Sequence, residues 1–186
     1  DPNGILTETI FIPTPYSAMV HDFVITENYI LIPVMPITGS LDRAMEGGPP
    51  FAWEPDKGMH IGVLPRHGGT AEDIRWLDMD IAFTFHFMNG FDDNGVITVD
   101  GCQMDHAPLF PTPDGGSTGP TEPRLTRWTI DLGDGGGSIE QICQILVEAF
   151  QQGLVKRLFP CQCPTFTGQG LLPPTWRSIK WIPTAY

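Results

Sequence analysis

Basic residues are scarce in this sequence. Its ten lysines and arginines stand against 22 aspartates and glutamates, which gives a net charge of −12. The basic residues are scattered rather than clustered, which argues against nucleic acid or an anionic membrane as a partner. We interpret the acidity as an aid to solubility. The sequence also lacks any run of roughly 18 apolar residues, so it predicts no membrane-spanning segment.

The first residues lack the features of a secretion signal. The opening "DPNGILTETIFIP" has no basic region followed by an apolar core. It also has no initiator methionine and reads as strand and turn. We therefore expect the chain to begin inside a longer protein.

Cysteine is sparse, with four residues at Cys102, Cys143, Cys161 and Cys163. Their spacing matches no zinc-binding pattern. Free thiols in a reducing cytoplasm are the simplest interpretation, and we expect a cytoplasmic protein. A secreted, disulfide-stabilised domain would instead need Cys161 or Cys163 paired with Cys102 or Cys143.

Glycine and proline are abundant, with 21 and 19 residues, and this favours many short strands joined by tight turns. An all-β fold of serial antiparallel strands is predicted up to residue 132, and both a sandwich and a propeller fit it. A helical turn is expected at 41–45, a short connection at 70–77, a hairpin turn at 92–95, and loop-rich chain over 103–125. The expected strands are 18–25, 29–34, 59–65, 81–88, 96–100 and 125–132.

The pattern changes after Gly133. The segment "SIEQICQILVEAFQQGLVKRL" carries apolar residues at helical spacing, and Ser138 with Gln141 forms a plausible capping box. We therefore predict an amphipathic helix over 138–158. The last 28 residues show no clear period.

Two histidines lie in apolar strand contexts. His86 stands among four phenylalanines in "AFTFHFMNGFDDNG", and His21 stands in "MVHDFVITENY". Strand side chains alternate, so His86 should share a face with Met88 and not with Phe85 or Phe87. Asp22 should point away from His21 for the same reason. His60, His67 and His106 are expected to have surface or simple hydrogen-bonding roles.

Two interpretations of His21 and His86 remain open from the residues alone. They are structural histidines of a non-catalytic β-rich binding module, or they are ligands that a rigid wall holds around one metal ion. Two ligands of one ion bring their ring nitrogens within roughly 3 to 3.5 Å of each other. Rings that point apart would favour the binding module.

Several blocks in order resemble the carotenoid cleavage oxygenases. They are "HDFVITENYILIPVMPI", "FHFMNGFDDNGVITVD" and "RLTRWTIDL". The stretch "GSLDRAMEGGPPFAWEPDKGMHIGVLPRHGGTAEDIRWL" between the first two resembles the lignostilbene dioxygenase branch. The resemblance covers about residues 1–133.

The resemblance implies a seven-bladed β-propeller, of which 1–133 would form about three blades, with Fe(II) on its axis. Four histidines would bind the iron, with His21 as the second and His86 as the third. Imidazole suits Fe(II), and the resemblance implies glutamates bonded to the far ring nitrogens of three of the histidines. The implied reaction cleaves a conjugated C=C bond of a stilbene or a carotenoid with O2 to give two carbonyl products. Phe110 falls near the position of a substrate-contacting aromatic residue.

The sequence departs from the family pattern in three respects. The first and fourth ligands would lie outside the chain, no E-F-P motif follows "TRWTIDL", and residues 134–186 form a divergent tail. Two histidines do not reproduce a four-histidine site. We therefore expect an internal fragment of a dioxygenase that is inactive on its own.

Overall fold

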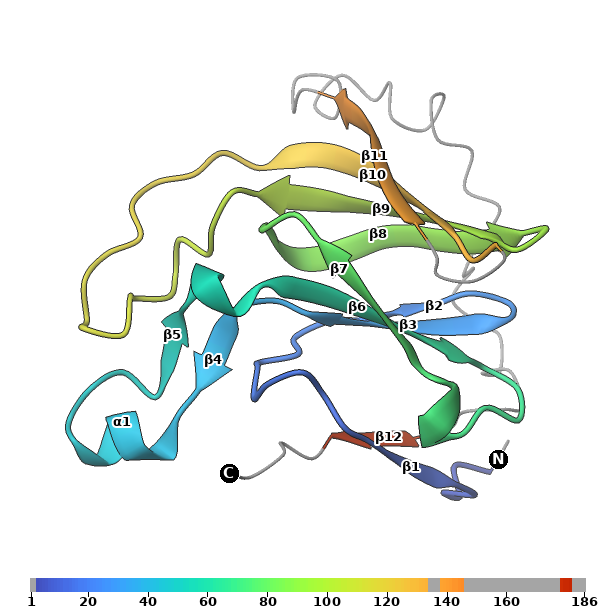
Figure 1. Ribbon diagram of the computed structural model, residues 1–186, viewed down its shortest axis with the longest axis horizontal. Coiled ribbons are helices and arrows are strands. Elements are labelled where there is room, and N and C mark those ends of the chain that lie inside the picture. Colours follow the sequence, from blue (N-terminus) through green and yellow to red (C-terminus); the bar gives the residue numbers. More distant parts are fainter. Residues whose placement is uncertain (1–2, 134–137, 146–177, 182–186) are drawn as a thin grey trace.

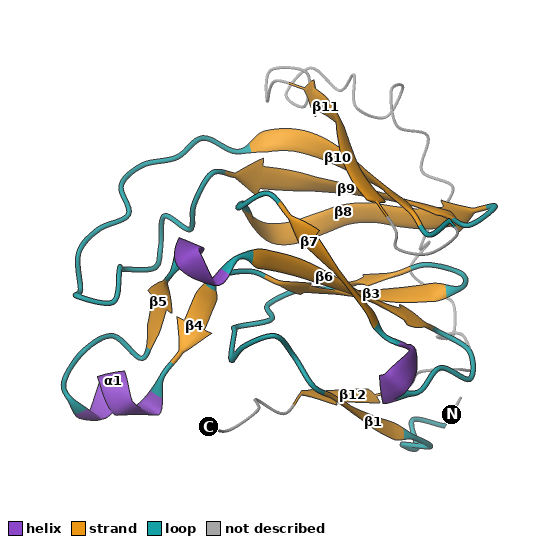
Figure 2. Cartoon of the chain, in the orientation of Figure 1, coloured by secondary structure: helices purple, strands orange, loops and turns teal. Residues whose placement is uncertain are grey.

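The computed structural model of the chain describes residues 3–133, 138–145 and 178–181, in which strands dominate (Figures 1 and 2). The helical elements of this part are the five-residue α1 (Leu41–Met45) and two 3-10 turns, η1 (Pro55–Lys57) and η2 (Ala71–Asp73). None of these helices has the length and apolar character needed to span a membrane. The all-β prediction is confirmed for the described residues.

The first large sheet has four antiparallel strands in the order β2-β3-β6-β7. Its strands follow one another along the chain, apart from an excursion of residues 35–58 between β3 and β6. The strand bounds are β2 (Val24–Ile25), β3 (Tyr29–Val34), β6 (Met59–Pro65) and β7 (Arg75–Met79).

The second large sheet is an uninterrupted antiparallel meander in the order β11-β10-β9-β8. Its first hairpin turns at Asn94 and Gly95, whose φ angles of 49° and 83° are those of a type I′ turn. The Asn-Gly turn expected at 92–95 is thus confirmed. The strand bounds are β8 (Phe83–Asp93), β9 (Val96–Met104), β10 (Arg124–Asp131) and β11 (Ser138–Ile145).

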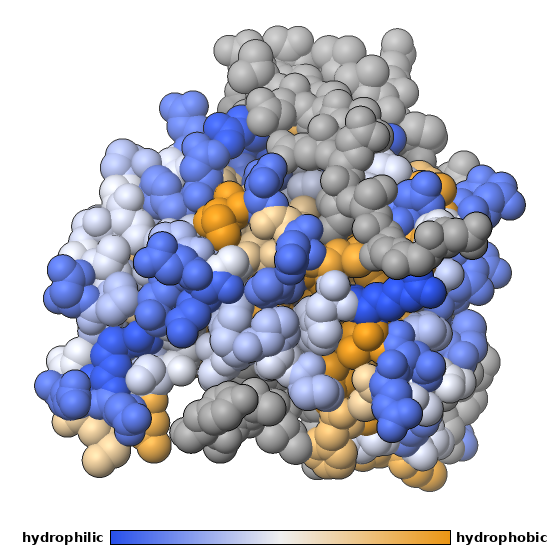
Figure 3. Space-filling model, viewed as in Figure 1, coloured by the Kyte–Doolittle hydropathy of each residue, from blue (hydrophilic) through white to orange (hydrophobic). Residues whose placement is uncertain are grey.

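Two small sheets complete the described chain. The excursion contains the hairpin of β4 (Ile37–Gly39) and β5 (Phe51–Trp53), with α1 between its strands. Figure 3 shows apolar surface at the lower left, where α1 lies in Figure 1, and Leu41 and Met45 of α1 are 74% and 78% exposed. The second small sheet is a parallel pair, β1 (Thr9–Ile12) with β12 (Ser178–Trp181).

Strands β3 and β6 are buried on both faces, which explains their nearly continuous apolar sequences. One face packs on the second large sheet, and the other packs under β1, because side chains alternate along a strand. The core between the large sheets contains Leu31, Ile61, Val63, Ile97, Val99, Trp128 and Ile130. The core beneath β1 contains Ile10, Ile12, Ile30, Ile32 and Leu64.

The large sheets meet where the edge strands β2 and β8 lie against each other. Gly90 of β8 makes this approach possible. A Cβ atom at Gly90 would lie only 2.2 Å from Cγ1 of Val24 in β2. The "N-G" that follows His86 in the sequence therefore lets β8 pack closely on the strand that follows His21.

One strand prediction, for 18–25, and one connection prediction, for 70–77, were wrong. Residues 18–25 form only an isolated bridge, Ala18 to Thr38, and the two-residue β2. The carboxylate of Asp22 accepts a hydrogen bond from the N–H of Phe23, and such local side-chain bonds compete with strand pairing. Residues 70–77 are not merely a connection, because β7 begins at Arg75 and adds an edge strand to the first sheet.

The helix predicted over 138–158 was wrong for its first eight residues. Ser138–Ile145 is strand β11, which pairs antiparallel with β10. Without β11, the side of β10 that faces away from β9 would have unpaired backbone N–H and C=O groups. The β-branched isoleucines at 139, 142 and 145 suit a strand as well as a helix, so this segment can pair there. Residues 146–158 lie outside the described residues. The helical turn at 41–45 and the loop between β9 and β10 are confirmed.

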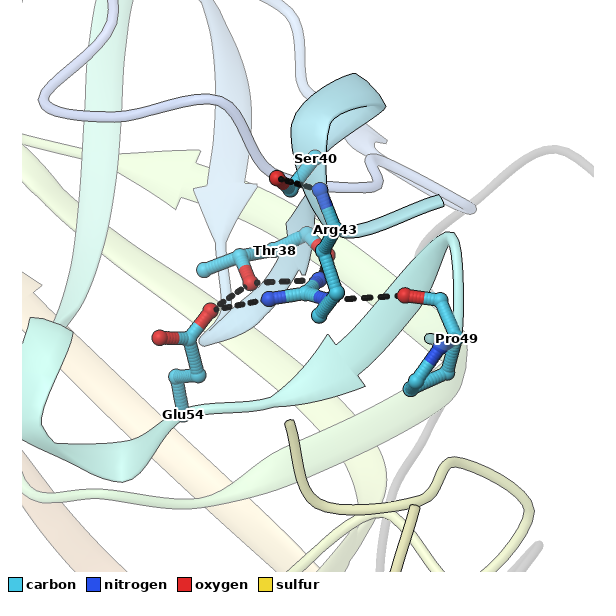
Figure 4. Close-up of polar contacts among 5 residues, drawn as sticks. All are labelled: Thr38, Ser40, Arg43, Pro49 and Glu54. Carbon is cyan, nitrogen blue, oxygen red and sulfur yellow. Dashed lines mark hydrogen bonds and ion pairs between the residues drawn. The ribbon is translucent and has the colours of Figure 1, made fainter. Parts of the chain in front are cut away.

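A polar cluster fixes the excursion at its base (Figure 4). Arg43 donates from its Nε and two terminal nitrogens to Pro49 O at 2.7 Å, Glu54 Oε2 at 3.0 Å and Thr38 O at 2.8 Å. The hydroxyl of Thr38 also donates to Glu54. Ser40 caps α1 by accepting from the N–H of Arg43.

The contacts of Glu54 hold its pKa below its usual range. Burial alone raises the pKa of this carboxyl, but hydrogen bonds from Thr38 and Arg43 and the charge of Arg43 outweigh burial. A depressed pKa in the folded state adds stability at pH values above the ordinary pKa of 4.5. This stability is lost as the pH falls through the folded-state pKa.

The approach of β2 to β8 can be tested by adding a methyl group. We expect Gly90→Ala to lower the free energy of unfolding by about 1 to 3 kcal/mol, because the new Cβ overlaps Val24. In a Val24→Ala background the same change should cost less, since the overlapping methyl group is gone. Urea unfolding of the four proteins measures both costs. Equal costs in the two backgrounds would contradict the packing described here.

Glu54→Gln should imitate protonation of the carboxyl. At pH 7 we expect the variant to be less stable than the wild type by about 1 to 2 kcal/mol, because it loses a charged acceptor. The difference should shrink as the pH falls below 4.5 and through the lower folded-state pKa, where the wild-type carboxyl also loses its charge. Thermal unfolding between pH 7 and pH 3 measures this, with the exposed Glu122→Gln as control. A difference that stays constant with pH would refute the assignment.

Candidate metal centre

His21 lies in the irregular segment immediately before β2. The backbone on both sides of it is anchored, because Met19 N–H donates to Ile37 O at 2.9 Å and Val24 pairs with Leu31 of β3. The His21 side chain itself is exposed. The segment therefore presents an imidazole to solvent from a backbone that is tied to both the excursion and the first sheet.

His86 lies in an irregular part of β8. The register with β9 shifts between Thr84 and Phe87 and again between Phe87 and Asn89. Phe85 and His86 together oppose one residue, Cys102, which is the arrangement of a β-bulge. Bulges bend a strand and redirect its side chains. The bulge in β8 thus includes His86 and helps to set the direction of its side chain.

Exposure around His86 alternates as the sequence predicts. His86 and Met88 are exposed, and the His86 side chain is 74% exposed, whereas Phe85 and Phe87 are half-buried against the apolar cores. Exposure therefore separates the histidine from the phenylalanines, although the ring centres of Phe85 and His86 are only 6.5 Å apart at the bulge. The buried phenylalanines fix the strand, and the imidazole is left free to make contacts outside the core.

The structure brings the two imidazoles together across 65 residues of sequence. The ring centres of His21 and His86 are 5.1 Å apart, with an angle of 64° between the ring planes. An imidazole bound through nitrogen places its ring centre roughly 3.2 Å from the metal, so two rings on neighbouring positions have centres roughly 4.5 to 5.5 Å apart. The pair fits a shared ion by this measure. The role of either residue as a ligand stays a prediction.

Asp22 is a polar neighbour of His86 that sequence reasoning missed. Its Oδ2 lies 3.8 Å from Nδ1 of His86 and accepts a hydrogen bond from Phe87 N–H at 3.0 Å. From the sequence alone, Asp22 was expected only to point away from the adjacent His21. No local signal links Asp22 to His86, since only the fold makes them neighbours.

A buried ion pair supports β8 just beyond the bulges. Arg127 of β10 donates twice to Asp100 of β9, from Nε at 2.7 Å and from a terminal nitrogen at 2.9 Å. Asn89 of β8 donates to the same carboxylate at 3.5 Å. Asp100 is 2% exposed, and a bidentate pair of this kind is strongly directional. It fixes the register of the three strands next to the irregular segment.

An aromatic wall leads from the two histidines toward Phe110. Phe85 lies edge-on to His21, with ring centres 6.0 Å apart, and contacts Phe83 at 4.4 Å. Phe83 in turn lies 6.4 Å from Phe110. Phe110 is therefore two aromatic rings removed from the imidazoles. It is half-buried against the core cluster that includes Trp53 and Met104.

The loop that carries Phe110 is held at several points. Phe110 N–H donates to Ala107 O at 3.2 Å, and Trp53 N–H donates to Pro111 O at 2.8 Å. The hydroxyl of Thr118 donates to Ala107 O at 2.9 Å. The loop is thus attached to β5 of the excursion. A substrate-contacting role of Phe110 stays a prediction.

The other histidines have ordinary partners, as predicted. His60 pairs with Asp78 at 2.7 Å, His67 with Glu27 O at 3.1 Å, and His106 with Gly119 O at 3.1 Å. Within residues 3–133, 138–145 and 178–181, no group of three or more His, Cys, Asp or Glu side chains suited to a metal ion was found. The described part of the chain thus provides a pair of imidazoles rather than a full coordination shell.

Cys102, which opposes the bulge, is a free thiol. Burial raises its pKa, so the thiol stays protonated at neutral pH. Its sulfur lies 4.0 Å from that of Met88. The side chains of the other three cysteines lie outside the described residues.

The largest part of the chain matches a known family. The family described as retinal pigment epithelial membrane protein matches residues 1–169. The match continues beyond residue 133, where the resemblance of the sequence motifs ends. The proposed boundary at 133 between a family domain and a tail stays a prediction.

Individual relatives point the same way. The chain is 37% identical over 144 residues to isoeugenol monooxygenase of Pseudomonas putida, covering 76% of this chain and 30% of that protein. It is 34% identical over 152 residues to lignostilbene-α,β-dioxygenase isozyme III of Sphingomonas paucimobilis, covering 78% and 31%. The crystal structure of Pseudomonas brassicacearum lignostilbene dioxygenase matches with a TM-score of 0.63 and 38% identity, covering 69% of this chain and 28% of that one.

The chain spans less than a third of the length of these relatives. The match over residues 1–169, the sequence identities and the shared fold agree with the resemblance that the His21 and His86 motifs carry. The chain belongs to the retinal pigment epithelial membrane protein family, the family of the carotenoid cleavage oxygenases.

Proposed function

We propose that this chain supplies two histidine ligands, His21 and His86, to the Fe(II) centre of an oxygenase that cleaves a conjugated C=C bond. The observation that carries the proposal is the approach of the two rings to 5.1 Å from positions 65 residues apart in the sequence. Relatives named as isoeugenol monooxygenase, carotenoid cleavage oxygenase and lignostilbene dioxygenase support the reaction class.

The two large sheets would be blades of a seven-bladed β-propeller. Each is a four-stranded antiparallel sheet, which is the unit from which propellers are built. Their meeting strands, β2 and β8, would be the innermost strands, because His21 lies three residues before the start of β2 and His86 lies in β8. This arrangement would place both imidazoles at the hub, where ligands from further blades complete the set.

The residues of this chain would hold the metal and shape the space around it. His21 and His86 would bind through ring nitrogens, and imidazole is a ligand type that suits Fe(II). The bound iron would supply a site at which O2 is activated. Phe85 and Phe83 would exclude water on one side of the pair, and their apolar rings suit a flat, conjugated substrate.

The overall reaction balances without a further reductant. One O2 and one C=C bond yield two C=O groups, and each carbon of the original double bond gains one oxygen. A small hydrophobic stilbene, phenylpropene or carotenoid would be the substrate. Phe110 would contact it at the far end of the aromatic wall. We also propose that the protein is cytoplasmic.

The isolated chain should not catalyse this reaction. Two imidazoles leave most of the coordination shell unfilled within the described residues. Purified chain loaded with Fe(II) under argon, then given oxygen and a hydroxylated stilbene, isoeugenol or an apocarotenoid, should form no carbonyl product above the protein-free blank. Turnover at ordinary enzyme rates, about 1 s⁻¹ or more, would refute this expectation.

A chimera tests the proposed function itself. Residues 1–133 would replace the homologous segment of Pseudomonas putida isoeugenol monooxygenase, which supplies the rest of the protein. We expect the chimera to bind iron and to cleave isoeugenol. Changing His21 or His86 to Ala should lower activity by more than about 100-fold, because a lost ligand costs more than a lost partner of a ligand.

His67→Ala serves as the matched control in the chimera. Its exposed ring lies at hydrogen-bond distance from Glu27 O, away from the two ligands, so activity should stay within about two-fold of the parent chimera. A folded, iron-containing chimera that cleaves nothing would overturn the proposal and favour a non-catalytic β-rich binding module. Unchanged activity in His21→Ala or His86→Ala would remove that residue from the ligand set.

A further inference from the structure

Strand β1 lies against the face of the first large sheet that points away from the second one. Its Ile10 and Ile12 are buried in the core beneath β1, with exposed fractions of 8% and 1%. Phe11 between them is 53% exposed, because side chains alternate along a strand. Buried side chains, rather than a hydrogen-bond ladder to the first large sheet, therefore hold β1 to the rest of the molecule.

The chain that follows β1 is anchored by polar contacts. The hydroxyl of Thr14 donates to Tyr16 O at 3.1 Å, and the hydroxyl of Tyr16 donates to Gly58 O, just before β6, at 2.7 Å. Ser17 O accepts a hydrogen bond from Gly39 N–H at 3.1 Å. These contacts and the buried isoleucines fix β1 without the help of a neighbouring strand. The edge of β1 is therefore preformed.

In the described part of the chain, β1 pairs with β12, which comes from the opposite end of the sequence (Figure 1). The parallel register joins Ile10 with Ile179 and Ile12 with Trp181. The two apolar residues of "SIKW" thus stand at the register positions of the two buried residues of β1. A shift by one residue in either direction would place Lys180 against one of these isoleucines, so the sequence specifies this register.

The two strands differ in what their edges would offer to another chain. An edge strand with unpaired N–H and C=O groups and an exposed aromatic side chain, as β1 would be without a partner, is a template for further pairing. Strand β12 contains Lys180, and Pro183 follows two residues after its end. Lysine and proline are residues with which proteins discourage pairing at an edge. Pairing with β12 therefore replaces an apolar edge by a less adhesive one.

The pairing of β1 with β12 is short and lies partly outside the family match. The family model matches residues 1–169, whereas β12 spans Ser178–Trp181. Four residue pairs join the strands, and parallel pairing is slightly less stable per residue than antiparallel pairing. We therefore expect β12 to leave β1 at a modest cost in free energy, while β1 stays in place.

We propose that residues 178–181 act as a detachable cap, which closes within one chain an edge of β1 that accepts an extended segment. The edge selects a segment that runs parallel to β1 and has apolar residues at alternate positions, opposite Ile10 and Ile12. Addition of a strand to a sheet edge is a common mode of peptide recognition. Neither His21 nor His86 takes part, so the cap and the proposed metal centre stand or fall separately.

Two adjacent substitutions in the full chain test the cap. The N–H groups of consecutive strand residues point to opposite sides, and proline has no N–H. Of Ile179→Pro and Lys180→Pro, one therefore removes a donor from the ladder with β1, and the other removes a donor from the free side of β12. Ala185→Pro, four positions beyond the end of β12, is the matched control.

Amide hydrogen exchange measured by NMR reports the state of the β1 edge. In the wild type and in Ala185→Pro we expect slow exchange at alternate amides of Thr9–Ile12. At least one of the two β12 variants should speed this exchange more than about 10-fold. Amides of β9 and β10 should stay protected in every variant, which shows that the fold is intact. Equal exchange of β1 amides in the wild type and in both β12 variants would overturn the cap.

A peptide tests whether the uncovered edge accepts a segment. The probe is a fluorescein-labelled peptide of residues 177–182, RSIKWI, followed by fluorescence anisotropy. We expect it to bind the faster-exchanging variant at least about 10-fold more tightly than the wild type, because the cap competes for the edge. The same peptide with Ile179→Pro should bind at least about 10-fold more weakly. Equal affinity of the RSIKWI peptide for the variant and the wild type would contradict the competition.

Dilution separates a cap within one chain from exchange between two copies. A cap that closes within the chain protects the β1 amides equally at every protein concentration. Protection that falls on dilution, together with a dimer in sedimentation velocity at the higher concentration, would place β12 on a second copy. That result would overturn the cap within one chain in favour of strand exchange.

Discussion

The close contact between β2 and β8 is the constraint on which the candidate site depends. These are edge strands of two separate sheets, and nothing in their own hydrogen-bond ladders brings them together. What does so is the apolar core shared by the sheets, to which β2 contributes Val24, together with a glycine, Gly90, that lets the backbones approach. Burial of apolar area therefore supplies the energy that sets two exposed imidazoles side by side.

Irregular backbone carries the polar chemistry, and regular sheet supports it. His21 precedes a two-residue strand, and His86 lies in a bulge, whereas β3 pairs with β6, and β9 with β10, in regular ladders. The buried pair of Asp100 and Arg127 lies at the boundary between these regions. A rigid scaffold with a few deviating segments is the usual way in which proteins position functional groups.

The sequence predicted those features that local chemistry determines. The Asn-Gly turn, the helical turn at 41–45 and most strands follow from residue preferences and alternation, and the structure has them. The helix over 138–145 failed because β-branched isoleucines suit a strand as well as a helix, and pairing with β10 decided between them. The motifs around His21 and His86 identified the family, but only the fold could show that the two rings meet.

Features that depend on distant contacts were not predictable in the same way. The register shifts in β8 have no signature in "FTFHFMNGFDD", because a bulge is fixed by the partner strand. The same is true of Asp22, whose contacts with Phe87 and His86 join residues more than sixty positions apart. Alternation along one strand predicts the face on which a side chain lies, but it does not predict which residues of other strands contact that side chain.

The two bulges make the length of β8 as important as its composition. Each inserts one residue relative to β9, so the strand between Thr84 and Asn89 is longer than its partner. Removing one of the extra residues would leave only one bulge, and the bulged side chains, that of His86 among them, would change direction. In this segment, replacement of a side chain alters one contact, whereas loss of one position would redirect the bulged residues around His86 and leave the paired residues on either side with their partners.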